Sequence, residues 1–116
     1  MSIQELGTIM EQQSPVKMIV MNNNYLGNVR QWQDLMFDHR HSFTRMLNPR
    51  YDAIAEGYGI PYDVAINRED LKDKIAKMLA TDGPYILECA VMEEENVLPM
   101  ITPGSAVDEM KLHLDI

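Results

Sequence analysis

The spacing of apolar residues at the start of the chain changes from a helical to an extended pattern. Ser2 and Glu5 have the spacing of a capping box, and apolar residues follow at intervals of three and four, which predicts a helix from Ser2 to Ser14. Val16–Met21 is apolar on both faces except at Lys17, as expected of a central parallel strand covered on both sides. The chain is therefore predicted to begin with a helix that leads into a buried strand.

The rest of the chain repeats this alternation. We predict one or two helical turns in 26–37, an exposed loop in 38–44, helices in 48–59 and 67–82, strands in 64–66 and 85–91, and a short helix in 105–112. Asn48-Pro49 and Asn67 are residue types that favour helix N-termini. The predicted buried stripe of the second of these helices consists of Leu71, Ile75, Met78 and Leu79. Helices that alternate with strands are typical of an α/β fold with a parallel sheet. Since three strands are few, we predict a partial doubly wound parallel sheet with flanking helices, part of a larger domain.

Composition and charge argue against several classes of protein. The 116 residues carry a net charge of −8 and no run of Lys or Arg, which argues against a nucleic-acid partner. Apolar stretches such as Met18–Met21 are far too short to span a membrane. The single cysteine, Cys89, excludes an internal disulfide, is expected to be buried and inert, and fits a reducing, cytoplasmic compartment. Ten Met residues favour flexible packing in a core or at a subunit interface.

The strongest candidate for chemistry is the run Asn22–Asn24, which directly follows the most apolar strand. Ligands of open α/β sheets bind beyond the carboxyl ends of the strands. Amide oxygens are suitable ligands for Mg²⁺ or Ca²⁺, and Gly27 would allow the backbone to approach a phosphate. The alternative is that these Asn residues only form a turn, which is the commoner role after a strand.

Other candidates carry weaker signals. His39 and His41 could hold a metal, although a solvated loop is the commoner arrangement, and Glu93–Glu95 is typical of a solvated acidic turn. Trp32 could pack in the core or line a pocket. The sequence contains no nucleophile–base pair and no zinc-binding spacing, and we assign no catalytic residue.

Three segments carry a resemblance to a known family. Pro15–Gln33, PVKMIVMNNNYLGNVRQWQ, closely resembles the metal-binding segment of acetolactate synthase (acetohydroxyacid synthase) large subunits. Glu95–Met110, ENVLPMITPGSAVDEM, is similar to the C-terminal signature of that family, and Ile3–Leu6 resembles the helix after its Gly-Asp-Gly triplet. The resemblance implies that residues 1–116 are the C-terminal part of a thiamine-diphosphate-binding domain, without its N-terminal strands and its Gly-Asp-Gly triplet.

The resemblance also implies a site. In that family, Mg²⁺ bridges the diphosphate of thiamine diphosphate, and its ligands are an Asp of the triplet, an Asn side chain and a backbone carbonyl. The implied metal ligands here are Asn23 and the Tyr25 carbonyl, whereas the Asp would precede Met1. The implied cofactor-binding residues are Asn23, Tyr25, Leu26, Gly27 and Asn28, and the implied substrate-channel residues are Val29 and Trp32. Asn28 departs from the Met often found in the family.

The reaction of that family decarboxylates pyruvate and joins the two-carbon unit to a second 2-oxo acid in branched-chain amino-acid biosynthesis. Its cofactor-activating glutamate comes from another domain of a neighbouring subunit, and nothing here matches it. We therefore expect the chain alone to bind no Mg²⁺ or thiamine diphosphate and to be inactive. We expect a homo-oligomer and no nucleic-acid or membrane partner, with a regulatory subunit as a possible partner of the longer protein. The alternatives are a piece of another thiamine-diphosphate carboligase or decarboxylase, or a non-catalytic oligomerising remnant.

Overall fold

The computed structural model describes residues 2–113. The chain divides into two compact units. Unit 1 comprises Met1–Asn23 and Asn48–Val91, and unit 2 comprises Asn24–Leu47 and Met92–Ile116. The two units are described separately below.

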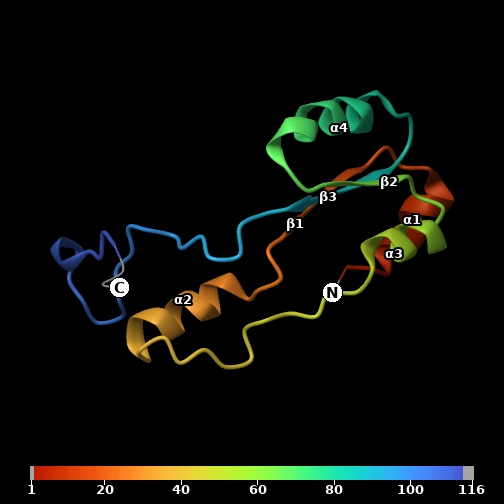
Figure 1. Cartoon of the computed structure of the whole chain (residues 1–116). Coiled ribbons are helices and arrows are strands. Elements are labelled where there is room, and N and C mark those ends of the chain that lie inside the picture. The colour runs from red at the N-terminus through yellow and green to blue at the C-terminus, as the bar shows by residue number, and fades with distance from the viewer. Residues whose placement is uncertain (1, 114–116) are drawn as a thin grey trace. The chain divides into compact units, whose positions relative to one another are not determined.

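Unit 1 is built on a parallel sheet of three strands, β1 (Lys17–Asn22), β2 (Tyr62–Ala65) and β3 (Tyr85–Ala90), in the order β1-β3-β2. Both outer strands run parallel to β3. Helices cover both faces of this sheet: α1 (Glu5–Gln12) and α3 (Tyr51–Gly57) lie on one face, and α4 (Arg68–Ala80) lies on the other (Figure 1). The predicted α/β class, with its parallel sheet and flanking helices, is confirmed.

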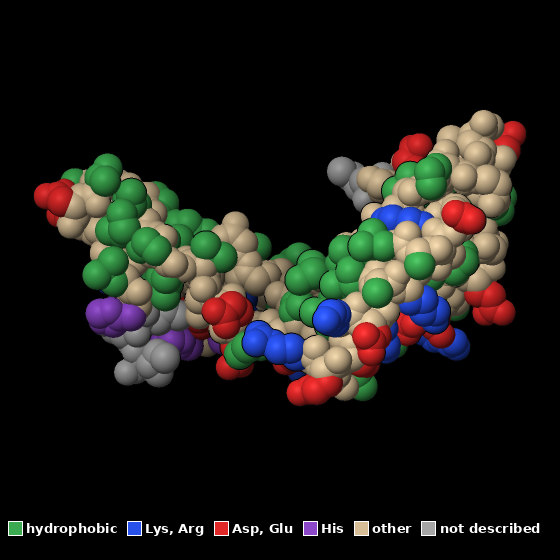
Figure 2. Space-filling view, turned by 90° about the horizontal axis from the view of Figure 1, so that it is seen from above, with side chains coloured by type: hydrophobic (Ala, Val, Ile, Leu, Met, Phe, Trp, Pro, Cys, Tyr) green, Lys and Arg blue, Asp and Glu red, His purple; other side chains and the backbone are tan. Residues whose placement is uncertain are grey.

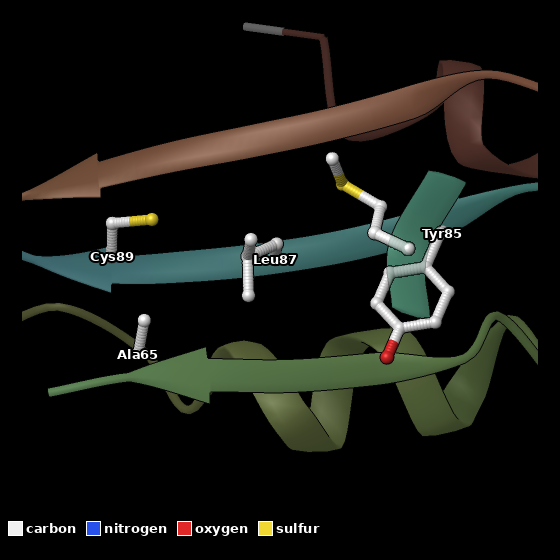
Figure 3. Close-up of a cluster of buried hydrophobic side chains, with 5 residues drawn as sticks. Ala65, Tyr85, Leu87 and Cys89 are labelled. Atoms are coloured by element: carbon white, nitrogen blue, oxygen red, sulfur yellow. The ribbon is translucent and has the colours of Figure 1, made fainter. Parts of the chain in front are cut away.

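The hydrophobic core has one cluster on each face of β3, because successive side chains of a strand point to opposite faces. Tyr85, Leu87 and Cys89 of β3 pack with Ala65 of β2 and with Met78 of α4 (Figure 3). The opposite cluster contains Leu6, Ala55, Ile60 and Ile86, beneath α1 and α3. The predicted burial of Cys89 is therefore confirmed.

The prediction of a central strand at Val16–Met21 is wrong for the described residues, because β3 takes the centre and β1 lies at an edge. Met18 and Val20 pack beneath α1 and α3, but Ile19 is 51% and Met21 65% exposed. Helix α4 packs on β2 and β3, so these two side chains are left uncovered. The polar exception, Lys17, donates from Nζ to the carbonyl oxygens of Thr81 and Gly83, 2.5 and 2.6 Å away, just after the C-terminus of α4.

Two helix starts differ from the prediction. Helix α1 begins at Glu5 because a tighter turn precedes it, in which the N–H of Glu5 donates to the main-chain carbonyl of Ser2 at 3.1 Å. Helix α3 begins at Tyr51, so Asn48 is not its N-cap. The Asn48 amide instead donates to the side chain of Asn22 at 2.7 Å.

Helix α4 begins as predicted, since the Asn67 side chain accepts a hydrogen bond from the N–H of Asp70 at 3.1 Å. Its buried stripe is narrower than predicted. Met78 is buried, and Leu71 and Ile75 pack against the core, but Leu79 is 65% exposed and faces away from the sheet. In the described part of the chain, no helix has the length and apolar character needed to cross a membrane.

Unit 2 contains α2 (Gly27–Met36) and a short 3₁₀ helix, Val107–Glu109. The predicted helical turns in 26–37 thus form one continuous helix, whereas the predicted helix in 105–112 is reduced to a single 3₁₀ turn. Residues 38–44 form a loop as predicted, but Thr44 at its end is only 2% exposed. Thr44 is buried because the loop returns to Leu26, whose N–H donates to the Thr44 carbonyl at 2.8 Å.

Candidate functional site

The asparagine run lies at the carboxyl end of β1, where the strand turns. Asn22 is the last residue of β1, and Asn24 adopts a left-handed backbone conformation with φ 57°. Asn is one of the few residues other than Gly that occupy this region readily. Asn24 therefore has the conformation expected of a turn residue, whereas Asn23 is the residue that the resemblance implies as a metal ligand.

A polar network on one face of the unit 1 sheet holds Asn22. Its amide nitrogen donates to Glu88 Oε1 at 2.7 Å, and its amide oxygen accepts from Asn48 at 2.7 Å. Glu88 Oε2 accepts from the Tyr62 hydroxyl at 2.5 Å. Burial, with the adjacent carboxylate of Glu88, raises the pKa of the Tyr62 phenol, so this group stays a donor. The network therefore fixes the residue that precedes the implied metal ligand.

In unit 2, the segment after the asparagine run pairs with Arg45. Tyr25 and Arg45 form an isolated antiparallel bridge, in which the bonds run from Leu26 N–H to the Thr44 carbonyl and from Met46 N–H to the Asn24 carbonyl, each 2.8 Å. In this pattern the N–H and the carbonyl of Tyr25 itself point away from the segment that contains Arg45. The Tyr25 carbonyl is therefore directed away from the pairing segment, as a backbone ligand must be.

Helix α2 begins directly after this bridge. Leu26 is its N-cap and makes no side-chain capping bond, and the first intrahelical bond runs from Arg30 N–H to the Leu26 carbonyl. The N–H groups of Gly27, Asn28 and Val29 therefore have no intrahelical acceptor. Such a helix terminus, with its partial positive charge, favours a phosphate oxygen.

Two arginines add positive charge around Tyr25. The guanidinium of Arg30 lies 4.7 Å and that of Arg45 5.8 Å from the centre of the Tyr25 ring. Arg30 also pairs with Glu94 at 2.7 Å, and this hydrogen bond raises the pKa of Arg30. Glu94 is thus an ion-pair partner, although Glu93–Glu95 is exposed to solvent as predicted.

The residues of unit 2 therefore fit a diphosphate: helix N–H groups without intrahelical acceptors and the nearby guanidinium of Arg45 offer donors and positive charge, whereas Arg30 is already paired with Glu94. The implied metal ligands fit a hard cation in type, because both are oxygens, but both are neutral. They are separated in the chain by Asn24 alone, which keeps their Cα atoms within about 7.6 Å of each other.

The two implied channel residues occupy one side of α2. Val29 and Trp32 are three residues apart, which places them on the same face of the helix. Val29 is 47% exposed and Trp32 is half-buried. A small molecule could therefore contact both side chains. Of the two alternatives for Trp32, packing in the core and lining a pocket, partial exposure favours the second.

Gln31 is the residue of this region that the sequence did not identify. It is 3% exposed, and its side chain makes a reciprocal pair with the backbone of Val97, donating to its carbonyl and accepting from its N–H, each at 2.8 Å. It also contacts Met100 Sδ at 2.9 Å. Two separate parts of the family resemblance, around Trp32 and around Val97, are therefore joined by one side chain. The sequence shows a polar amide at Gln31 within RQWQ, but its partner, Val97, lies 66 residues away and could not be identified from local spacing.

Unit 1 also contains an apolar cavity of about 230 Å³. Its lining residues are Ser2, Ile3, Leu6, Met18, Val20, Pro49, Tyr51, Ile54 and Ile86. This lining has no charged side chain, so the cavity offers an apolar surface and no acid–base chemistry.

The loop that contains His39 and His41 in unit 2 packs around the carboxylate of Asp34, which the sequence pattern did not connect with these histidines. His39 Nδ1 lies 3.0 Å from Asp34 Oδ1, and His41 Nε2 contacts the same oxygen. Burial tends to raise the pKa of Asp34, but the hydrogen bonds from His41 and His39 outweigh it and lower the pKa. Asp34 is therefore a carboxylate at neutral pH.

Comparison with known proteins decides the family. Residues 1–89 match the family described as thiamine pyrophosphate enzyme, C-terminal TPP binding domain. The chain belongs to this family. The solved structure of the thiamine diphosphate-dependent 4-hydroxybenzoylformate decarboxylase of Rhodococcus jostii RHA1 matches 81% of the chain and 18% of that protein, with a TM-score of 0.72 and 23% identity. That likeness supports the fold of a thiamine pyrophosphate enzyme domain.

Curated relatives of this thiamine pyrophosphate enzyme domain are longer proteins. The acetolactate synthase large subunit of Porphyra purpurea is 37% identical over 95% of this chain and 19% of that protein. The acetolactate synthase isozyme 2 large subunit of Escherichia coli K12 is 39% identical over 95% of the chain and 20% of that protein. The mitochondrial acetolactate synthase catalytic subunit of Saccharomyces cerevisiae is 38% identical. The chain thus spans about a fifth of the length of the relatives it matches.

Proposed function

We propose that this chain forms part of the thiamine-diphosphate-binding domain of an acetolactate synthase, an enzyme that decarboxylates pyruvate and joins the two-carbon unit to a second 2-oxo acid. The observation that carries the proposal is the similarity to acetolactate synthase subunits over 95% of the chain, at 37 to 39% identity. The helix terminus and the guanidinium of Arg45 beside Tyr25 support it, because they suit the diphosphate of the cofactor.

The chain's own residues would anchor the cofactor. Asn23 and the Tyr25 carbonyl would hold Mg²⁺, the backbone of Leu26, Gly27 and Asn28 would bind the diphosphate, and Val29 and Trp32 would line the substrate channel. Bound thiamine diphosphate supplies the carbanion chemistry, and the protein supplies position and charge. The Asn22–Glu88 network would keep Asn23 oriented.

The proposal is tested in the protein whose reading frame contains this chain. That frame is expected to encode a Gly-Asp-Gly triplet upstream, and the purified protein is expected to form acetolactate from pyruvate. Its Asn23→Ala variant is expected to bind the Mg²⁺–cofactor complex about tenfold or more weakly, because even outer-shell partners of a metal contribute about 10-fold to 100-fold. Isothermal titration calorimetry measures this change.

The matched control replaces the amide of Gln12, which is exposed at the end of α1, and Gln12→Ala is expected to leave the affinity unchanged. The 116-residue chain alone should bind neither Mg²⁺ nor the cofactor more tightly than about 100 μM and should form no acetolactate, because its proposed metal ligands are all neutral. Three outcomes would contradict the proposal: a reading frame without an upstream Gly-Asp-Gly triplet, an equal loss of affinity in Asn23→Ala and Gln12→Ala, or binding of Mg²⁺ or cofactor by the chain alone more tightly than about 100 μM.

We also propose that the 116-residue chain self-associates through the outer edge of β1. Among the described residues, β1 is an edge strand of the sheet, and its Ile19 and Met21 are exposed; such an edge pairs readily with another chain. The apolar cavity between α1, β1 and α3 adds further uncovered surface on the other face of this strand.

Light scattering at about micromolar concentration is expected to give a mass above that of the monomer. Ile19→Lys is expected to shift the mass toward the monomer, because a lysine on an edge strand opposes pairing. Leu79→Lys, at a position on α4 that is also exposed, should leave the mass unchanged, since a helix offers no strand edge. A monomeric mass for the unchanged chain would refute self-association.

A further inference from the structure

Outside the proposed cofactor anchor, unit 2 gathers three metal-ligating side chains. Asp34 lies near the end of α2, and His39 and His41 lie in the loop that follows. One potential ligand atom from each of the three side chains lies within 4.8 Å of those from both others. Two imidazoles and a carboxylate thus converge on one point.

The fold brings these groups together by curling the loop back onto α2. Asp38 and His39 both have left-handed backbone conformations, with φ 50° and 57°. Gln33, which precedes Asp34, then fixes the far side of the loop: its amide donates to the Ser42 carbonyl at 2.9 Å and accepts from the Ser42 N–H at 3.0 Å. The loop that carries the two histidines is therefore held against the helix that carries Asp34 by the side chain of Gln33.

Exposure of the cluster matches a metal site with room for solvent. The Asp34 side chain is 8% exposed, while those of His39 and His41 are 49% and 34% exposed. The carboxylate therefore forms the floor, and the imidazoles remain accessible. Figure 2 shows histidine side chains at the surface of the part of the molecule that carries α2.

We propose that Asp34, His39 and His41 form a binding site for a divalent transition-metal ion of the zinc type. Imidazole and carboxylate groups are ligands of Zn²⁺ and related ions, at about 2.0–2.2 Å from the metal, which places ligand atoms roughly 3.3–3.6 Å apart in a tetrahedron. The distance of 3.0 Å between His39 Nδ1 and Asp34 Oδ1 is a few tenths of an ångström below this spacing, and His41 Nε2 lies closer still to the same oxygen, so ion binding requires these groups to separate slightly. Three protein ligands leave a fourth position for water.

This site differs in chemistry from the proposed cofactor anchor. Asn23 and the Tyr25 carbonyl offer neutral oxygens, which suit Mg²⁺, whereas nitrogen ligands select the softer zinc-type ions. An excess of Mg²⁺ should therefore leave the zinc site occupied. The two assignments can fail separately, because the zinc site uses no residue of the anchor.

The test is a Zn²⁺ titration of the whole chain by calorimetry, with Co²⁺ absorption as a second reading of a tetrahedral site. One equivalent is expected to bind, and Asp34→Asn, His39→Ala and His41→Ala are each expected to weaken binding about tenfold or more, since even outer-shell partners contribute that much. The matched control is Asp38→Asn, which removes a carboxylate that is 93% exposed in the same loop and should change nothing.

Zn²⁺ should also raise the thermal unfolding midpoint of the chain and of Asp38→Asn, because an ion that binds only the folded state stabilises it. Circular dichroism checks that each variant is folded. If Asp34→Asn does not fold, His39→Ala and His41→Ala still test the site. Absence of Zn²⁺ binding, equal binding by Asp34→Asn and Asp38→Asn, or displacement of Zn²⁺ by Mg²⁺ would overturn the proposal.

Discussion

Replacing Gln31 by leucine is expected to lower the free energy of unfolding by about 2–4 kcal/mol, because the change leaves two main-chain groups of Val97 without their partner. The Gln31 side chain is 3% exposed, so water does not readily replace the lost hydrogen bonds. Leucine keeps a similar side-chain volume, which separates the hydrogen-bond effect from a cavity effect. Chemical denaturation measures the loss, and amide hydrogen exchange at Val97 locates it.

Gln33 provides a matched control on the same helix. It forms an equivalent reciprocal pair with the backbone of Ser42, but this pair is open to solvent. Gln33→Leu is therefore expected to cost less than about 1 kcal/mol, since water can satisfy the Ser42 groups. If both variants lost the same stability, or if exchange at Val97 did not accelerate in Gln31→Leu, burial of the Gln31 pair would not be the cause.

Local patterns predicted those elements whose determinants lie within a few residues. The cap at Asn67, the strand predicted in 85–91 and the α/β alternation depend on side chains that are neighbours in sequence, and the structure shows all three, with the strand ending at Ala90. Asn48 shows the limit of this reasoning. Its residue type favours a helix cap, but a hydrogen bond to Asn22, 26 residues away, takes precedence.

The position of β1 was not predictable from its own residues. An apolar run with two apolar faces indicates burial in a complete sheet, but it does not say which neighbouring strands lie within the same chain. In the described residues β3 is paired on both sides and β1 on one. The exposure of Ile19 and Met21 follows from this pairing and from the placement of α4 over the other two strands.

The polar groups that connect distant segments were the least predictable part of the site. Glu88 lies within an otherwise apolar strand, so the sequence did not indicate a polar network there. Asp34 lies five residues before His39 and was not grouped with His39 and His41. Each acts through partners that only the fold brings near: Asn22 and Tyr62 for Glu88, and the returning loop for Asp34. A spacing rule cannot identify such groups, because the partners come from different elements.

Replacing Glu88 by leucine is expected to lower the free energy of unfolding by about 2–4 kcal/mol. The carboxylate accepts from the Asn22 amide at 2.7 Å and from the Tyr62 hydroxyl at 2.5 Å, and hydrogen bonds to a charged group contribute roughly 1.5–3 kcal/mol each. The estimate lies below their full sum because the network is only partly buried. Glu88→Gln keeps an acceptor for one donor and is expected to lose about half as much.

The same network predicts how stability depends on pH at the alkaline end. Burial and the Glu88 carboxylate raise the pKa of Tyr62 in the folded state above its ordinary value of about 10. Between these two pKa values the unfolded chain binds fewer protons than the folded chain, so the free energy of unfolding falls as pH rises above about 10. Tyr62→Phe removes the titrating group. Denaturation midpoints between about pH 8 and 11 should therefore fall less steeply for Tyr62→Phe than for the unchanged chain, and parallel curves would show that Tyr62 does not carry the effect.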